Sequence, residues 1–179
     1  MPQNDLEQII IGCKRGNEAS FSQLIDIYAK RCFGYFYRLS GSRATSEDLL
    51  SELFVKLVEK IGTYKGGSFN GWLFTMASNL FHDHLRFRQR QARLLSEQGR
   101  RVMTLPAHSE DDDLAEIDEL QAALGKMDED VRELIMMRYY SQLSFDEISQ
   151  SRGEPLGTTL SKLHRGMKRL REIMGVNKK

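Results

Sequence analysis

Apolar side chains recur at steps of three and four along most of the chain, and this spacing restricts the possible fold more than any other feature. Between residues 21 and 39 the series is Phe21, Leu24, Ile25, Tyr28, Cys32, Phe36 and Leu39. Side chains three and four residues apart lie on one face of an α-helix, whereas a half-buried strand needs a period of two. No segment of the sequence has a period of two, so we predict an all-α fold.

Two more helices are predicted in the N-terminal half. Thr45 to Asp48 has the pattern of a capping box that would begin the second helix. Its apolar stripe consists of Leu49, Leu50, Leu53, Phe54, Leu57, Val58 and Ile61. Glycines at 62, 66 and 67 end this helix and form a turn. The third helix has Trp72, Leu73, Met76, Ala77 and Leu80 as its apolar positions and continues past residue 88.

The charges are segregated along the chain, although the net charge is only +1. Residues 82–101 carry a local charge of +4, residues 110–119 contain seven acids and no base, and residues 156–179 carry +6. Two basic blocks separated by an acidic one are typical of a bipartite binder of a polyanion such as nucleic acid. Ordinary solvated helix faces are the alternative explanation for each block taken singly.

Glycine, proline and hydroxyl residues interrupt the apolar periodicity before the acidic run. Pro106 in particular disfavours helix at the residue before it. We therefore predict two small helical domains, residues 1–96 and 114–179, joined by a flexible acidic linker at residues 97–113. Seven carboxylates cannot lie along a phosphate backbone without repulsion, so residues 108–119 are expected to stay off the DNA.

The last third of the chain has the pattern of a helix-turn-helix. Ser144 and Glu147 form a capping box for a short helix, Gly153 lies in the turn, and Pro155 suits the first helical position because its φ is already helical. The next helix places apolar residues at 156, 160, 163, 167, 170 and 173 or 174, which we predict to be its buried face.

The opposite face of that last helix has the chemistry of DNA recognition. It carries Thr158, Thr159, Ser161, Lys162, Arg165, Lys168 and Arg169. In a helix-turn-helix the second helix enters the major groove, its N-terminal residues reach base edges, and its cations neutralise phosphates. An ordinary helical hairpin with a basic surface is the alternative.

Two stretches in this order resemble the extracytoplasmic-function (ECF) sigma factors, a two-domain group of the sigma-70 family of bacterial RNA polymerase subunits. The first is SEDLLSELFVKLVEKIGTYKGGSFNGWLFTMASNLFHDHLR, and the second is LSFDEISQSRGEPLGTTLSKLHRGMKRLRE. The resemblance covers about residues 5 to 175. It implies that the N-terminal domain binds core polymerase and the promoter −10 element, and that the C-terminal domain binds the −35 element.

The resemblance also implies roles for individual residues. For polymerase it implies contacts by Asp48, Ser51, Glu52 and Lys56. For capture of a flipped −10 base and the adjoining phosphates it implies Tyr64, Lys65, Gly66, Asn79, Arg86, Arg88 and Arg90. At the −35 element it implies Ser161, Lys162, His164 and Arg165, with Thr158 and Thr159 near the helix start. The chain departs from the family at Leu160, where a basic residue is common, and at Thr159, where a small apolar residue is common.

The implied partners are the β and β′ subunits of RNA polymerase, promoter DNA and an anti-sigma factor. The linker would occupy a basic channel of the polymerase, so replacing Asp111, Asp112 and Asp113 with Asn should alter initiation or promoter escape. A helix-turn-helix regulator that acts without replacing a sigma subunit is the main alternative, and a helical adaptor for an inhibitory protein is a second.

Other classes are disfavoured by what the sequence lacks. No Gly-rich phosphate loop or nucleophile with a placed base is present, so we expect no catalytic residues and no cofactor. His82 and His84 point about 200° apart on a helix and cannot share a metal, so no metal site is expected. Cys13 and Cys32 form no CxxC motif, which fits a reducing cytoplasm. No apolar run reaches the roughly 18 residues of a membrane span, and no signal peptide is visible.

Overall fold

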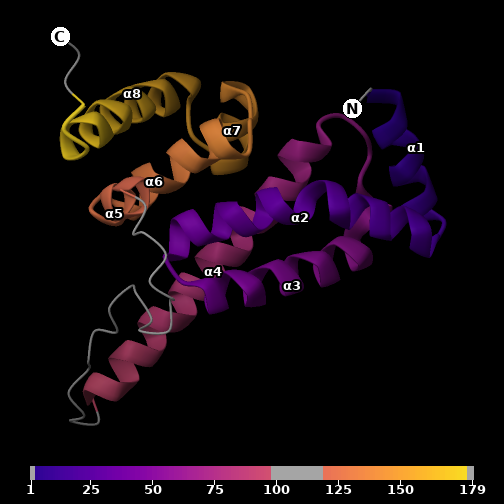
Figure 1. Ribbon diagram of the computed structural model, residues 1–179, viewed down its shortest axis with the longest axis horizontal. Helices are drawn as coiled ribbons and strands as arrows, with labels where there is room; N and C mark the ends of the chain where they lie inside the picture. Colours follow the sequence, from indigo (N-terminus) through magenta and orange to yellow (C-terminus); the bar gives the residue numbers. More distant parts are fainter. Residues whose placement is uncertain (1–2, 98–118, 177–179) are drawn as a thin grey trace.

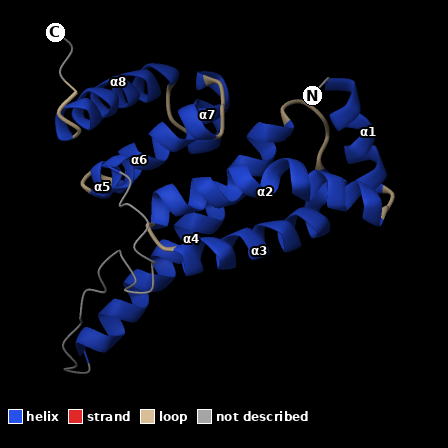
Figure 2. Ribbon diagram, viewed as in Figure 1, coloured by secondary structure: helices blue, strands red, loops and turns tan. Residues whose placement is uncertain are grey.

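The computed structural model describes residues 3–97 and 119–176, and within these segments every regular element is a helix (Figure 2). In chain order the elements are α1 (Gln3–Lys14), α2 (Glu18–Ser40), α3 (Arg43–Lys60), the 3₁₀ turn η1 (Ile61–Thr63), α4 (Phe69–Glu97), α5 (Glu119–Gly125), α6 (Glu129–Ile135), the π-helical turn η2 (Met136–Tyr140), α7 (Phe145–Arg152) and α8 (Leu156–Ile173). The predicted all-α fold is confirmed. The predicted linker, apart from residue 97, and all but the last residue of the acidic run lie outside the described residues.

Helices α1 to α4 form the first helical group, in which α2 contacts each of the other three (Figure 1). The centre of this group is aromatic: Tyr35, Phe36, Phe74 and Phe81 are fully buried. The rings of Tyr35 and Phe74 meet edge to face with centroids 5.4 Å apart. Burial of each such side chain contributes about 2 to 3 kcal/mol, so these residues fix how α2 packs against α4.

The start of α3 differs from the prediction. Gly41 adopts a left-handed conformation (φ 69°) that ends α2, and the side chain of Ser42 then accepts a hydrogen bond from the Thr45 amide at 3.3 Å. Helix α3 therefore begins at Arg43, and the capping box predicted at residues 45–48 is wrong. The physical reason is that a glycine in this conformation reverses the chain within one residue, so the next hydroxyl can cap a new helix at once.

Helices α5 to α8 form the second group. The capping box predicted for α7 is confirmed, because the Ser144 side chain accepts from the Glu147 amide and the Glu147 carboxylate accepts from the Ser144 amide. Gly153 (φ 62°) ends α7 in the left-handed conformation. Pro155 is the N-cap of α8 rather than its first helical residue. Together these contacts set the short turn between α7 and α8.

The buried face of α8 is rotated relative to the prediction. Thr159, Leu163, Gly166 and Leu170 are buried, whereas Leu156 and Leu160 are 40% and 42% exposed. A Cβ atom at Gly166 would lie 2.4 Å from Cγ1 of Val131, so α8 approaches α6 closely along the line that contains this glycine. This close packing turns Thr159 inward and the two leucines outward.

The two helical groups pack against each other. Helices α2 and α4 of the first group contact α5, α6, α7 and η2 of the second. Helix α6 lies between α2 and α8, so α8 is on the side of the second group that faces away from the first (Figure 1). The outward face of α8 is therefore open to a partner in this arrangement.

Candidate nucleic-acid and polymerase interfaces

The outward face of α8 presents hydroxyl and cationic side chains over its whole length. Its exposed members are Thr158, Ser161, His164, Arg165, Lys168, Arg169 and Arg171. Arg165 donates from Nε to the carbonyl of Ser161 at 3.3 Å, and Arg169 pairs with Glu172 at 3.4 Å. All the expected −35 residues except Thr159 and Lys162 thus lie on a surface that a DNA groove can reach.

Thr159 does not belong to this surface. Its side chain is fully buried within the second helical group, and its Oγ1 has no hydrogen-bond partner within the described part of the chain. The prediction that Thr159 contacts DNA is therefore wrong. Its neighbour Thr158 is exposed in the first turn of the helix, where the helix dipole also favours phosphate.

Lys162 is directed toward the base of the helix-turn-helix. Its ammonium lies 2.9 Å from Glu154 Oε1 and 3.1 Å from Asp130 Oδ2. The hydrogen bonds to Glu154 and Asp130 raise the pKa of Lys162, so it stays charged. While these contacts persist, Lys162 ties α8 to α6 and to the turn instead of pointing outward.

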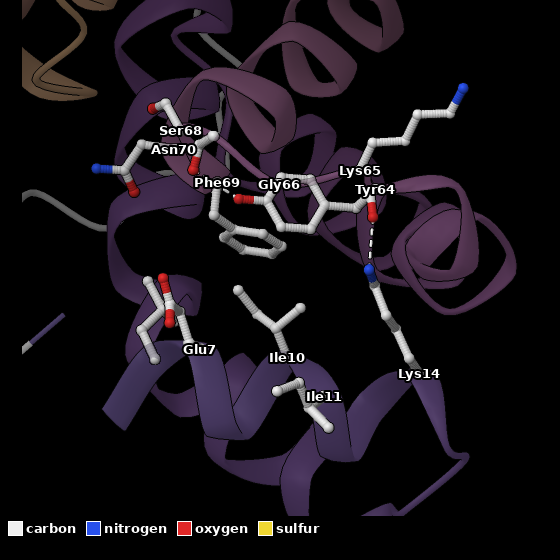
Figure 3. A pocket seen from close by; sticks show the side chains of 12 residues that line it. Glu7, Ile10, Ile11, Lys14, Tyr64, Lys65, Gly66, Ser68, Phe69 and Asn70 are labelled. Carbon is white, nitrogen blue, oxygen red and sulfur yellow. Dashed lines mark hydrogen bonds between the residues drawn. The ribbon is translucent and has the colours of Figure 1, made fainter. Parts of the chain in front are cut away.

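A cavity of about 390 Å³ lies between α1 and the loop that follows η1 (Figure 3). Its loop side is formed by the segment from Tyr64 to Asn70, and Ile10 and Glu7 of α1 face that segment from below (Figure 3). Lys14 donates from Nζ to the Tyr64 carbonyl at 2.5 Å, which joins α1 to the loop. The loop was predicted from the sequence to bind the −10 element, but the contribution of α1 to the cavity was not predicted. No motif in the sequence of α1 indicates a pocket.

Tyr64 supports this cavity from within an aromatic cluster. It is only 8% exposed, its hydroxyl donates to the Gly67 carbonyl at 2.7 Å, and its ring centroid lies 5.3 Å from Phe69 and 5.4 Å from Trp72. Gly66 and Gly67 have φ values of 103° and 89°, a region that residues with a side chain rarely adopt. The tight turn at these glycines is what allows the phenol to reach back to the chain.

Asn79 lies away from this cavity. It is exposed on α4 and lines a separate hollow of about 500 Å³ with His82, Arg86 and Arg152. Nine residues separate it from Asn70 on the same helix, which corresponds to about 14 Å along the axis. The expectation that Asn79 and Tyr64 line one pocket is therefore not met in this arrangement.

The basic half of α4 extends past the other helices of its group (Figure 1). Arg86, Arg88 and Arg90 are exposed there, and Arg86 pairs with Asp83 at 3.2 Å. Phe87 and Leu94 are also exposed on this extension. The extension therefore offers cations and apolar side chains together, as expected for contact with a nucleic-acid strand.

The candidate polymerase face lies on α3. Asp48, Ser51 and Glu52 are exposed, while Lys56 is partly buried and pairs with Glu52 at 3.2 Å. The same face contains Val55, which is 58% exposed. Sequence analysis missed this residue, although its position outside the apolar stripe was a usable signal.

Val58 was expected in the core but is also exposed. The buried residues of α3 are Ser46, Leu49, Leu53 and Leu57, which follow steps of three and four and turn Val58 outward. Val58 is therefore a second exposed valine, beside Val55, on the surface around the expected polymerase contacts. An apolar patch ringed by charges is typical of a protein-binding site.

A buried polar network joins the two helical groups, and sequence analysis did not predict it. Glu133 of α6 is almost completely buried and accepts hydrogen bonds from Ser78 (2.6 Å), Tyr35 (3.3 Å) and Arg152 (3.0 Å). Ser78 and Tyr35 donate to Oε1 of this carboxylate and Arg152 donates to Oε2. His82 Nε2 also lies 2.9 Å from Oε2. The only signal in the sequence was an acid directly before an apolar run, which does not identify its partners.

Ionisation of this network follows from its geometry. Burial acts to raise the pKa of Glu133, but hydrogen bonds from His82 and Ser78 outweigh burial, and the pKa is lowered. The hydrogen bond to Glu133 raises the pKa of His82 above its ordinary value. Glu133 is thus held as the carboxylate, and the contact favours the protonated form of His82.

Hydrogen bonds to backbone carbonyls flank the network. Arg31 of α2 donates to the Ser141 carbonyl at 2.7 Å, and Arg132 of α6 donates to the Leu39 carbonyl at 2.8 Å. Each arginine reaches from one helical group to the other. The contact between the groups is therefore specific and polar, and it leaves the outward faces of α3 and α8 uncovered.

Comparison with known proteins places the chain in a family. The Sigma-70 region 2 model matches residues 24–91, and the Sigma-70 region 4 model matches residues 117–170. The chain is 34% identical over 161 residues to the ECF RNA polymerase sigma factor SigE of Mycolicibacterium smegmatis, covering 87% of this chain and 62% of SigE. It is 31% identical to the RNA polymerase sigma factor CarQ of Myxococcus xanthus, covering 89% of this chain and 92% of CarQ.

A solved structure has the same fold. The sigma factor RpoE, in complex with the anti-sigma factor NepR from Bartonella quintana, matches with a TM-score of 0.73 at 24% identity, covering 88% of this chain and 98% of that one. The chain belongs to the ECF group of the sigma-70 family of RNA polymerase sigma factors. The two family models and the sequence identities to SigE and CarQ confirm the sigma-factor prediction over the regulator that acts without replacing a sigma subunit.

No helix within residues 3–97 and 119–176 combines the length and apolar character needed to cross a bilayer.

Proposed function

We propose that this sigma factor directs core RNA polymerase to its promoters with the three surfaces described above. The domain division predicted from the sequence, 1–96 and 114–179 around a linker at 97–113, separates polymerase and −10 binding from −35 binding. The observation that carries the proposal is the outward face of α8, which is cationic and open while its other face is packed on α6 and α7. A helix with these properties after a capped helix and a short turn suits the major groove.

At the −35 element the contacts come from α8. The proposed set comprises Thr158, Ser161, His164, Arg165, Lys168 and Arg169, with Lys162 as the residue that holds the helix in place. Arg165 is suited to guanine O6 and N7, and Lys168 and Arg169 to phosphates. Thr159 is left out because it is buried.

At the −10 element the cavity beside Tyr64 receives an unstacked base. Its aromatic floor and the nearby Lys65 and Lys14 suit a flat ring with phosphates on either side. Unstacking a base costs a few kcal/mol, and stacking on an aromatic surface returns about 1 to 3 kcal/mol. Arg86, Arg88 and Arg90 on the extension of α4 contact the phosphates of the opened strand, and Asn79 contacts it outside the cavity.

Polymerase is bound through α3. The proposed face combines Asp48, Ser51, Glu52 and Lys56 with the exposed Val55 at its centre. This helix would contact β′ of the polymerase core, whose β and β′ subunits are the partners that the family resemblance implies. Burial of an apolar centre inside a polar rim is the usual anatomy of a stable protein interface.

The protein acts as a binding factor without catalysis, in the cytoplasm where polymerase and promoter DNA are found. An anti-sigma factor is a further partner that the structural relative suggests, since that relative is bound to one. Such a partner would compete for the same uncovered faces on α3 and α8.

The test is multi-round transcription of genomic fragments by core polymerase of the source organism, with and without this protein. We expect defined start sites that appear only when the protein is added. The Arg165→Ala, Lys168→Ala double variant should lose them, whereas Lys30→Ala, an exposed lysine on α2, should retain them. Absence of new transcripts, with salt-sensitive binding of the protein alone to a palindromic site, would contradict the proposal.

A further inference from the structure

Two leucines are exposed in the first two turns of α8, the end of the helix that the proposed function directs into the major groove. Leu156 is the first residue of the helix and Leu160 lies one turn later, and both are about 40% exposed. Leu160 lies next to Ser161 and one turn before His164, both of which are exposed. Leu160 therefore lies at the edge of the surface proposed to contact the −35 element, about 40° from His164 around the helix axis, and Leu156 lies one turn before it.

The packing of α8 keeps these leucines outside. Thr159 occupies the buried position between them, and Gly166 sits where any side chain would collide with Val131. Rotation of α8 to bury Leu160 would move Gly166 away from Val131 and open a gap in the core. The exposure of Leu160 is thus a property of the folded domain and costs the apolar burial that the side chain would otherwise gain.

The surroundings of the leucines indicate a polyanionic partner. Around the axis of α8, Arg171 lies about 20° and Lys168 about 80° from Leu160, and both are exposed. An apolar protein groove over Leu160 would have to desolvate these cations without compensation, whereas DNA supplies phosphates to them. Charge complementarity therefore favours DNA as the occupant of this surface.

DNA offers one prominent apolar group in the major groove, the C5-methyl group of thymine. A leucine has no donor or acceptor and cannot read guanine or adenine through hydrogen bonds. We infer that Leu160, with Leu156 one turn earlier, contacts a thymine methyl group and selects an A·T pair at one position of the −35 element. This inference rests on the proposed function of α8 and adds a specific base preference to it.

The experiment removes the methyl group without changing base pairing. Holoenzyme made with this protein first selects its preferred −35 sequence from a randomised promoter library by protein-dependent transcription. Each thymine of that sequence, on either strand, is then replaced singly by deoxyuridine, and binding of wild-type and Leu160→Ala holoenzymes is measured. Val176→Ala is the matched control, because Val176 is a similarly exposed aliphatic side chain beyond the end of α8.

For wild type we expect deoxyuridine at one position to weaken binding about fourfold, the effect of one buried methyl group. Leu160→Ala should bind the thymine and deoxyuridine promoters equally at that position, and Val176→Ala should behave as wild type. Protein-dependent transcription with no deoxyuridine effect, or an effect that survives in Leu160→Ala, would overturn the methyl contact alone. Weaker binding of Leu160→Ala to core polymerase with unchanged deoxyuridine response would assign the leucines to a protein partner and also overturn it. Absence of any protein-dependent transcript would instead overturn the proposed function together with the contact that rests on it.

Discussion

His82 of α4 and Glu133 of α6 meet across the boundary of the two helical groups, with 2.9 Å between Nε2 and Oε2. The side chain of Glu133 is buried, whereas the side chain of His82 is 43% exposed. The pair joins α4, which carries Asn79 and the arginines expected at the −10 element, to α6, against which α8 packs. Its protonation therefore connects the association of the two groups to pH.

Stability of the contact should depend on pH in a defined direction. The pKa of His82 is raised from 6.5, so its contribution is full below about 6.5 and is lost as the pH rises through the higher folded-state pKa. The pKa of Glu133 is lowered from 4.5, so its contribution is present above 4.5 and is lost as the pH falls through the lower folded-state pKa. Urea midpoints should decline from pH 6 to pH 8.5, and His82→Gln should remove most of that decline. An equal decline in the variant would contradict the assignment.

Replacement of Glu133 by Gln should destabilise the protein. The amide has a single acceptor oxygen and no charge for Arg152 and His82, so about 2 kcal/mol of unfolding free energy is expected to be lost. Arg152 keeps its contacts with Asp130 and Glu154, which limits the loss. Urea denaturation of Glu133→Gln measures it, with the exposed Glu129→Gln on the same helix as control. Equal stability of the two variants would show that the network contributes little.

Gly166→Ala tests the register of α8. The added methyl group would lie 2.4 Å from Val131 Cγ1, so we expect a loss of about 1 to 3 kcal/mol from overpacking. Gly157→Ala on the same helix meets nothing within 4 Å and should stabilise by up to about 1 kcal/mol. Thermal unfolding of both variants separates the effect of packing from that of helix propensity. A stabilised Gly166→Ala would mean that α8 does not approach α6 at this glycine.

Val55→Asp tests the polymerase face. A charge at the centre of an apolar contact should lower affinity for core polymerase at least tenfold, or about 1.4 kcal/mol. Val176→Asp, which changes a similarly exposed valine far from α3, should bind normally. Affinity is measured with core polymerase and no DNA, so that promoter contacts do not contribute. Full affinity of Val55→Asp would remove this residue from the interface.

Arg165→Ala tests base recognition by α8. If Arg165 reads a base, discrimination at one position of the −35 element should fall by about 1 to 3 kcal/mol. Holoenzyme binding to single-base promoter variants at several salt concentrations measures this, with Lys30→Ala as control. A uniform loss over all sequences with a smaller salt dependence would indicate a phosphate contact instead.

The sequence by itself determined the class of fold and the local start and end signals of several helices. The three-and-four spacing predicted α2 to α4 and α8, and the Ser144–Glu147 capping box was correct, because periodicity and capping depend on residues close together in the chain. The sequence also predicted the basic helix α8, which follows the capped helix α7 and a short turn. The same local information misplaced the start of α3. Gly41 ends α2 and the adjacent Ser42 caps α3, so α3 begins earlier than the predicted capping box at residues 45–48.

The orientation of helices around their own axes was decided by tertiary structure. Leu156 and Leu160 have the same periodicity as core residues, but a glycine packed against Val131 turns them outward and buries Thr159 instead. Likewise, α1 became a wall of the cavity beside Tyr64, and Glu133 met His82, Ser78 and Tyr35, through contacts between residues about 50 to 100 positions apart. Periodicity shows that a helix has an apolar face, but which residues lie at its centre depends on the shape of the partner helix.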